Sequence, residues 1–326
     1  MQRRVFNQAA LAALTAGLAY VHRSASAADW APTRPVRIIA GAPGSILDVF
    51  ARQIAEKLAA ALGQPVIVEN KGGGGGVVAM ETAASSLADG HTVVITTFVE
   101  MTVNPWLYER LSYDPVRSFA PISMLYSGQI LLAAHPSFPA DSLSDLIRVA
   151  KAQPGKYFYG SSGVARPPHI WVERFKTLAG IDIAHVPYKG AAPLTTALLT
   201  GEIPLAMEGA PALIQHVKAG KLKAIAVTGD RRLQALPSVP TFAESGFPAI
   251  GLTWVAVVAP AATPAAAIAR LNQEFVRVMT LPEVKAAQEQ AGRVVVASTP
   301  EVLAAAIRTE LPEWESVVRS ARIKPE

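Results

Sequence analysis

The chain has 326 residues, 51% of them hydrophobic, and no cysteine, so disulfides, thiol catalysis and zinc–thiolate sites are excluded and packing alone must hold the fold. That length exceeds what one hydrophobic core usually serves, which predicts two domains. The formal net charge is +5, but no cluster of Lys and Arg is interleaved with aromatic residues, which argues against nucleic acid as a partner.

The first 27 residues have the pattern of a cleaved export signal. Arg3 and Arg4 precede an apolar run over residues 9–21, and Ala25-Ser26-Ala27 has the A-x-A form of a cleavage site. The run is too short to span a bilayer, so we expect a soluble periplasmic protein that begins at Ala28. Cleavage would remove three of the 30 basic residues and none of the 25 acidic ones, which leaves a net charge of +2. The paired arginines leave open whether export follows the twin-arginine or the general route.

Strands and helices alternate along the mature chain. We expect strands at 36–40, 65–69, 91–97, 130–134, 157–161, 183–186, 203–207 and 223–228. We expect helices at 46–62, 78–87, 143–151, 168–179, 193–199 and 211–219, with a loop at 72–76 and a polar turn after residue 97. This alternation predicts parallel sheet covered on both faces, and the lack of a flexible linker predicts domains joined by chain that crosses between sheets.

The stretch RIIAGAPGSILDVFAR, residues 37–52, passes from a strand through a turn into a helix. Ser45 can cap that helix and Asp48 can complete a capping box. The free backbone N–H groups and the helix dipole at such an N-terminus favour an anion. From these residues alone, binding a ligand and merely starting a helix are equally good explanations.

Patterns typical of enzymes are weak or missing. Gly74, Gly76 and Ala79 fit G-x-G-x-x-A, with Glu100 further on, but the glycines begin several residues after the strand and Glu100 lies beyond the expected spacing. The histidines are scattered without an H-x-x-x-H pair, and neither G-x-S-x-G nor S-x-x-K occurs. We therefore expect no catalytic residue, no metal and no cofactor, with a dinucleotide-dependent oxidoreductase as the less favoured alternative.

Several ordered stretches resemble a known family. They include LGQPVIVENKGGGGG at 62, YGSSGVARPPH at 159 and HVPYKGAAP at 185. From Val36 to Lys324 the sequence resembles the periplasmic solute-binding receptors of tripartite tricarboxylate transporters, the Bug family. The resemblance implies an α/β type II periplasmic-binding-protein fold, with two lobes, a ligand cleft between them and a two-strand hinge. One lobe would comprise residues 28–126 and 255–326, and the other residues 127–254.

The implied function is capture of a small organic acid and its delivery to membrane permease subunits, by a monomer that catalyses nothing. A sensor subunit for a signalling system would bind the same ligand and is a second alternative. The resemblance places ligand-binding residues at five strand ends: Pro43, Gly44, Ser45 and Asp48; Thr97, Phe98, Val99 and Glu100; Ser161, Ser162, Gly163, Arg166 and His169; Pro187, Tyr188, Lys189 and Gly190; and Glu208. It also implies that the turn before residue 46 holds a carboxylate through backbone N–H groups.

The chain departs from the family pattern at several of these positions. Phe98 and Met101 replace small polar residues, which predicts a partly apolar pocket for an aromatic or branched acid, unless both side chains belong to the core. Arg166 adds a fixed fork of donors suited to a carboxylate, unless it is a solvated charge at the rim. Lys189, beside a tight turn, is expected to point to water.

Overall fold

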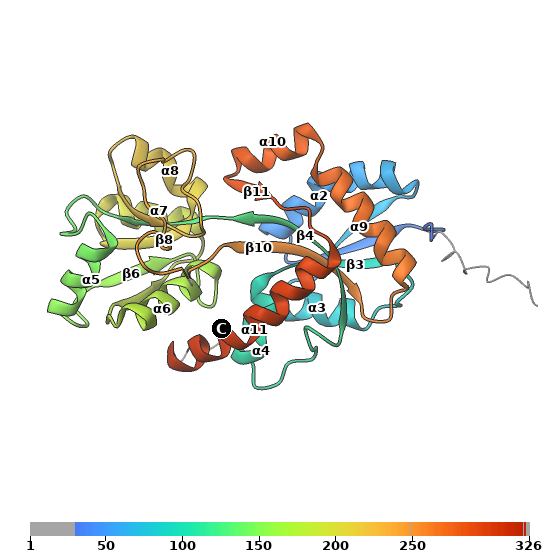
Figure 1. The fold of residues 1–326 in the computed structure, drawn as a ribbon, viewed down its shortest axis with the longest axis horizontal. Helices are drawn as coiled ribbons and strands as arrows, with labels where there is room; N and C mark the ends of the chain where they lie inside the picture. The colour runs from blue at the N-terminus through green and yellow to red at the C-terminus, as the bar shows by residue number, and fades with distance from the viewer. Residues whose placement is uncertain (1–29, 249, 322, 324–326) are drawn as a thin grey trace, which may run out of the picture. The chain divides into compact units, whose positions relative to one another are not determined.

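The computed structural model describes residues 30–248, 250–321 and 323. The expected export signal and its cleavage site lie outside these residues. Residues 31–326 form one compact unit, and its strands make two sheets (Figure 1). We call each sheet with its helices a lobe.

The first sheet has the strand order β11-β4-β10-β3-β1-β2. Strands β1 (Val36–Ala40), β2 (Val66–Asn70) and β3 (Thr92–Thr97) are parallel, and β4 (Phe119–Gly128), β10 (Thr253–Pro260) and β11 (Arg293–Val295) form the antiparallel part. Its helical segments are α2 (Ile46–Leu62), η1 (Gly74–Gly76), α3 (Val77–Ala84), η2 (Val99–Val103), α4 (Asn104–Leu107), α9 (Ala265–Met279), α10 (Pro282–Gln290) and α11 (Pro300–Ala321).

The second sheet has the order β7-β6-β8-β5-β9. Its strands are β5 (Ile130–Ala134), β6 (Phe158–Ser161), β7 (Ala184–Pro187), β8 (Leu205–Gly209) and β9 (Lys223–Val227). Its helices are α5 (Leu143–Ala152), α6 (Pro167–Ala179), α7 (Ala191–Thr200) and α8 (Ala210–Lys218). The lobe boundaries at residues 126/127 and 254/255 stay a prediction.

The predicted parallel pairing is present in both sheets, but each sheet also contains antiparallel strands. Strand β5 runs antiparallel to both β8 and β9, and β10 runs antiparallel to both β3 and β4. The reason is connectivity: β5 and β10 each enter their sheet directly from the other lobe, so each begins beside the carboxyl end of a parallel strand and runs back against it.

Two crossings join the sheets, and side chains tie them together (Figure 1). The first crossing is Gln129 between β4 and β5, and the second is the segment 228–252 between β9 and β10. Gln129 Nε2 donates to the carbonyl oxygens of Thr228 at 2.8 Å and Arg231 at 2.6 Å. Thr253 pairs with Gly128, and its hydroxyl donates to the Gly128 carbonyl at 3.0 Å. The hinge is therefore a linked pair of crossings.

The hinge also fixes which edges of the sheets face each other. Val255 pairs with Thr97, so β10 arrives from the second lobe beside the carboxyl end of β3. Ile130 pairs with Gly209, so β5 begins beside the carboxyl end of β8, and β6 and β7 end at the same edge. The carboxyl ends of the parallel strands in both lobes thus lie at the edges that the hinge joins, which is where α/β sheets place ligands.

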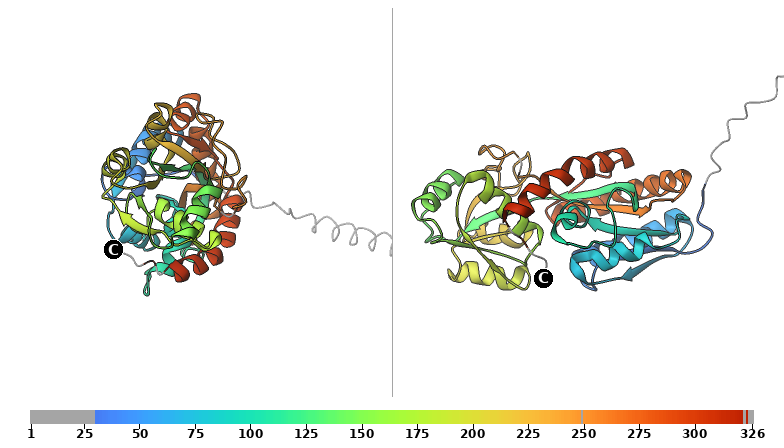
Figure 2. Two further views of the ribbon diagram at one scale, coloured as in Figure 1. Left: turned by 90° about the vertical axis from the view of Figure 1, so that its left-hand side faces the viewer. Right: turned by 90° about the horizontal axis from the view of Figure 1, so that it is seen from below.

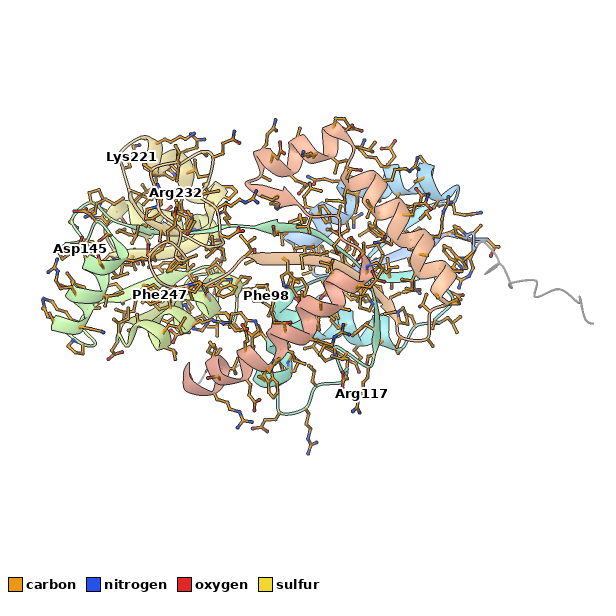
Figure 3. All side chains as sticks on the ribbon, in the orientation of Figure 1. Phe98, Arg117, Asp145, Lys221, Arg232 and Phe247 are labelled. Atoms are coloured by element: carbon orange, nitrogen blue, oxygen red, sulfur yellow. The ribbon has the colours of Figure 1, made fainter. Side chains whose placement is uncertain are left out.

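An aromatic cluster packs the lobes together beside the hinge. Trp171 of α6, in the second lobe, stacks on Phe98 of the first at 5.8 Å between centroids and meets Trp314 of α11 edge-on at 4.8 Å. Phe98 is labelled in Figure 3. Arg174, one turn further along α6, pairs with Glu313 of α11 at 2.8 Å. Helix α11 therefore extends from the first lobe to α6 of the second (Figure 2).

Candidate functional site

The loop between β1 and α2 is shaped by Asp48. The Gly44 N–H donates to Asp48 Oδ2 at 2.8 Å, and Arg52 Nε donates to Oδ1 at 2.8 Å. Ser45 is the N-cap of α2, and its Oγ accepts from the Asp48 N–H at 3.3 Å, as the sequence predicted. Hydrogen bonding from Asn70, Gly44 and Arg52 holds the pKa of Asp48 below its usual value. Both carboxylate oxygens of Asp48 are thus engaged within the protein.

The rest of this loop faces outward. Pro43 and Gly44 are exposed and Ser45 is half-buried, while Ile46, the first residue of α2, is 56% exposed. Gly44 has a φ of 74°, a left-handed conformation that suits glycine. The N–H groups of Gly44, Ser45 and Asp48 are bonded within the protein, so the N–H groups left to an anion are those of Ile46 and Leu47, the first two residues of α2.

A capping box starts the helical segment after β3. The Thr97 N–H donates to Glu100 Oε2 at 2.8 Å, the Val99 N–H donates to Thr97 Oγ1 at 3.1 Å, and the Thr97 hydroxyl also bonds Glu100 Oε2. The expected polar turn is therefore wrong, because these bonds open a π-helical turn that continues into α4. Phe98 and Met101 have no exposed surface and belong to the core, so neither lines a pocket in this structure. Val99 is also buried.

The carboxylate of Glu100 lies at the N-terminus of α3. A Cβ added at Gly76, the N-cap of α3, would come within 2.6 Å of Glu100 Oε1, so only glycine fits there. Burial raises the pKa of Glu100, although Thr97 and the charge of Arg166 act in the opposite direction. A dinucleotide phosphate would need this helix N-terminus, which an acidic side chain already occupies. Gly76 therefore serves a packing role, while Gly74 has a φ of 53°, a conformation that suits glycine.

A pair of stacked histidines supports the loop between β6 and α6. The rings of His169 and His185 lie 3.8 Å apart and nearly parallel, at 9°. His185 Nε2 is 2.7 Å from the Oγ of fully buried Ser161, and His169 Nδ1 accepts from the Ala165 N–H at 2.9 Å. Burial lowers the pKa of His169 to about 4 and that of His185 to about 3, so both rings are neutral at physiological pH.

The hydrogen bond from Ala165 to His169 holds Ala165, the residue before Arg166, in a strained backbone conformation. Ala165 has a φ of 53°, a left-handed conformation that costs a non-glycine residue about 1–2 kcal/mol. Arg166 follows as the exposed N-cap of α6, near enough for its charge to act on Glu100 and Tyr108 of the other lobe. His169 is 6% exposed and bonds the loop from below, so its side chain lies beneath the surface of the loop.

The loop after β7 lies beside the loop after β6. The Tyr188 N–H donates to the Ser161 carbonyl at 2.9 Å, and the Tyr188 hydroxyl donates to Glu202 Oε1 at 2.9 Å. Pro187 and Lys189 are exposed, which agrees with the expectation that Lys189 points to water. Gly190 has a φ of 105° and precedes α7.

Glu208, on β8, is the last of the expected ligand-binding residues. Its Oε1 accepts from the Gly209 N–H at 2.9 Å, while its Oε2 is buried and has no hydrogen-bond partner among the described residues. Burial raises the pKa of Glu208 despite the nearby Ser162 hydroxyl and the Gly209 N–H. Among all the described residues, no group of three or more His, Asp or Glu side chains could hold a metal ion.

Sequence reasoning placed every expected residue at one of the two facing edges but missed their supports. Asn70, His185 and Gly76 shape the site without having been expected to. Asn70 donates to the Gly41 carbonyl at 3.0 Å and accepts from Arg52, which ties the first loop to β2. The available signal was that Asn70, Gly76 and His185 lie inside stretches that resemble the family, and Gly76 also stood in the G-x-G-x-x-A pattern. Whether the expected residues contact a ligand stays a prediction.

Two α/β lobes with loops at facing edges and a double crossing between them define a solute-binding receptor of the periplasmic-binding-protein class. The chain belongs to the tripartite tricarboxylate transporter family of receptors, whose family model matches residues 50–322. Across the described residues, no helix is both long enough and apolar enough to cross a membrane.

Individual relatives agree with this assignment. The chain is 33% identical to BugT of Bordetella pertussis over 313 residues, which is 95% of each chain. A structure described as Rpa4515 of R. palustris with adipate is 32% identical and superposes with a TM-score of 0.76, covering 91% of this chain and 100% of that one. MatC of Rhodopseudomonas palustris with bound malate is 28% identical, with a TM-score of 0.74 and coverage of 88% and 99%.

Proposed function

We propose that this protein is an exported, monomeric receptor that captures a small carboxylate in the cleft and delivers it to the permease of a tripartite tricarboxylate transporter. The main support is the pairing of two features on facing edges. The first lobe contributes the N-terminus of α2, where the N–H groups of Ile46 and Leu47 follow the exposed turn, and the second contributes the exposed guanidinium of Arg166. Backbone N–H groups at a helix N-terminus and a guanidinium both favour a carboxylate.

The relatives support the same ligand class, because Rpa4515 and MatC are described with adipate and malate, respectively. The preference for an aromatic or branched acid rested on Phe98 and Met101. Both side chains lie in the core, so we propose no such preference. Nothing in the described residues favours the oxidoreductase alternative, and the position of Glu100 against Gly76 counts against it.

A thermal-shift screen of organic acids, beginning with adipate and malate, tests this function. A ligand at about a hundredfold its dissociation constant stabilises the folded state by about 2.7 kcal/mol, which raises the unfolding temperature by several degrees. Arg166→Ala is the matched variant and should show a smaller shift at the same concentration. If no carboxylate changes the unfolding temperature, the proposal fails.

Delivery requires a second assay. Cells that lack the receptor but retain the permease should take up the radiolabelled acid only when the protein is supplied. Uptake that is equal with and without the protein would contradict the transport role and leave the sensor alternative.

A further inference from the structure

One face of α6 carries polar side chains that the proposed function does not use. His169, Glu173 and Lys176 follow each other at intervals of four and three residues, so they lie on the same side of the helix. His169 and Glu173 are both buried, and each is 6% exposed. Burying a carboxylate is costly unless other groups pair with it and donate hydrogen bonds to it.

Three groups surround Oε1 of Glu173. The hydroxyl of Tyr159 on β6 donates to it at 2.7 Å, and Lys176 Nζ donates to it at 2.8 Å. Burial and the charge of Glu173 raise the pKa of Tyr159 well above its usual value, so this hydroxyl keeps its proton. His169 Nε2 lies 4.0 Å away, which is too far for a hydrogen bond but close enough for the charge to act on this nitrogen. The carboxylate therefore favours a proton on Nε2 of His169.

A proton on Nε2 leaves the other ring nitrogen of His169 free to accept a hydrogen bond. The ring is neutral at physiological pH because burial lowers its pKa to about 4, so it carries one proton. Nδ1 accepts from the Ala165 N–H at 2.9 Å. The other tautomer would place its proton on Nδ1, facing that N–H, and this hydrogen bond would be lost. The backbone conformation of Ala165 thus depends on the tautomer of His169.

The loop that Ala165 ends also determines where Arg166 lies. The stacked rings of His185 and His169 hold the two ends of the loop, residues 161–165. Within the loop, a Cβ added at Gly163 would come within 3.1 Å of Arg166 Cγ, so the stem of Arg166 lies against Gly163. A shift of the loop would therefore shift the guanidinium.

We propose that Glu173 is a positioning residue for Arg166 and acts through His169, which rests on the proposed function of Arg166. The carboxylate keeps the proton of His169 on Nε2, Nδ1 holds the Ala165 N–H, and the loop presents the guanidinium in one place. A guanidinium that is already in place loses less conformational entropy on binding. Glu173 therefore raises the affinity for a carboxylate without touching it.

Nitrogen-15 NMR of the mature protein without ligand tests the first step. We expect the wild type at physiological pH to show His169 with a proton on Nε2 and none on Nδ1. Glu173→Gln keeps the size of the side chain and removes its charge, so the other tautomer should appear. Exchange of the Ala165 N–H with solvent should become about tenfold faster, as expected for the loss of one hydrogen bond.

Glu274→Gln is the matched control. Glu274 is also a buried helical carboxylate that pairs with cations, here two arginines, but it lies on α9 of the first lobe. Its replacement should leave the tautomer of His169 and the exchange of the Ala165 N–H unchanged. A general loss of stability is thereby separated from a local effect on the loop.

Calorimetry with adipate and malate tests the second step. Glu173→Gln should weaken binding about tenfold, and Glu274→Gln should leave it unchanged. His169→Asn offers a side-chain oxygen in place of Nδ1 and has no tautomers, so this variant should keep most of the affinity. Adding Glu173→Gln to His169→Asn should then cause no further loss, because Glu173 acts through the imidazole.

A wild-type His169 with its proton on Nδ1 overturns the inference, whether or not any variant folds. A Glu173→Gln variant that keeps the wild-type tautomer and exchange rate also overturns it, as does a tenfold loss of affinity when Glu173→Gln is added to His169→Asn. If neither acid binds the wild type, the proposed function fails for both acids, while the spectra without ligand still decide whether Glu173 holds the loop.

Discussion

Glu310 makes the stability of the protein depend on pH in a direction opposite to that expected of a paired carboxylate. It lies on α11, and Trp254 Nε1, at the start of β10, donates to its two oxygens at 2.9 and 3.0 Å. Burial raises the pKa of Glu310 from 4.5 to about 7, with a further rise from the nearby charge of Glu313. The indole N–H lowers the pKa by less than burial raises it.

The sign follows from proton binding. Between pH 4.5 and about 7 the folded protein holds the proton on Glu310, while the unfolded chain has lost it. Unfolding therefore releases a proton, and the contribution of Glu310 to stability is complete below pH 4.5 and is lost as the pH rises through 7. The shift corresponds to about 3 kcal/mol, which partial exposure to solvent reduces to about 2 kcal/mol.

Glu310→Gln should remove this dependence because the amide oxygen still accepts from Trp254 and does not titrate. We expect the variant to be about 2 kcal/mol more stable than wild type at about pH 8, with the difference shrinking toward zero below about pH 5. Urea unfolding of both proteins at the two pH values measures it. His169 and His185 titrate equally in both proteins, so their loss of stability in acid cancels in the comparison.

Glu315→Gln is the control, since Glu315 lies on the same helix and pairs at the surface with Arg319 at 2.8 Å. Its effect should stay within about 0.5 kcal/mol at either pH. A difference between wild type and Glu310→Gln that is the same at both pH values would refute the reasoning, as would a Gln variant that is less stable at about pH 8.

Three further predictions concern the cleft and the contact between the lobes. Arg166→Ala should weaken carboxylate binding by about 2–3 kcal/mol in calorimetry, and equally in a Glu100→Ala background, because Glu100 is already engaged by its capping box; unchanged affinity would make Arg166 a solvated charge. Ala165→Gly should stabilise the fold by up to about 1 kcal/mol, because glycine adopts a φ of 53° without strain. It should also weaken ligand binding, because the loop before Arg166 becomes more flexible. Tighter binding would show that the strained backbone does not position Arg166. Trp171→Ala should cost about 3–5 kcal/mol in urea unfolding and enlarge the radius of gyration in X-ray scattering without ligand, and an unchanged radius would show that the aromatic cluster does not hold the lobes together.

The parallel strands and the helices around them could be predicted from the sequence because their local patterns and their tertiary structure agree. β1 and α2 have the bounds that the apolar spacing predicted, and α5 differs by one residue. The strands β4, β10 and β11 and the helices α9 to α11 were not predicted. The direction of β10 depends on its pairing with β3 and β4, which are far away in sequence, and no local pattern encodes that pairing.

The site could be predicted as a set of loops but not as a set of contacts. The family resemblance placed Phe98 and His169 in the expected binding set. The structure instead packs Phe98 between tryptophans and sets His169 under Ala165. Which way a side chain turns at a strand end depends on neighbours from the other lobe, such as Trp171, and a single sequence does not show them. Thr97 and Glu100 were the exception that could have been found, since T-x-x-E is itself a capping-box pattern.

The linked crossings of the hinge give the molecule a simple mechanical response. Gln129 ties one crossing to the other, and Thr253 ties the return strand to Gly128. Two crossings fastened at the same level resist sliding and shear more than bending, so we expect the lobes to move mainly by rotation about the hinge, against the contact between α6 and α11. Any ligand that bridges the lobes, whatever its chemistry, would then change the distance between them. A pair of fluorophores with one on each lobe would then convert this receptor into a sensor whose signal needs no redesign when the cleft is altered for a different solute.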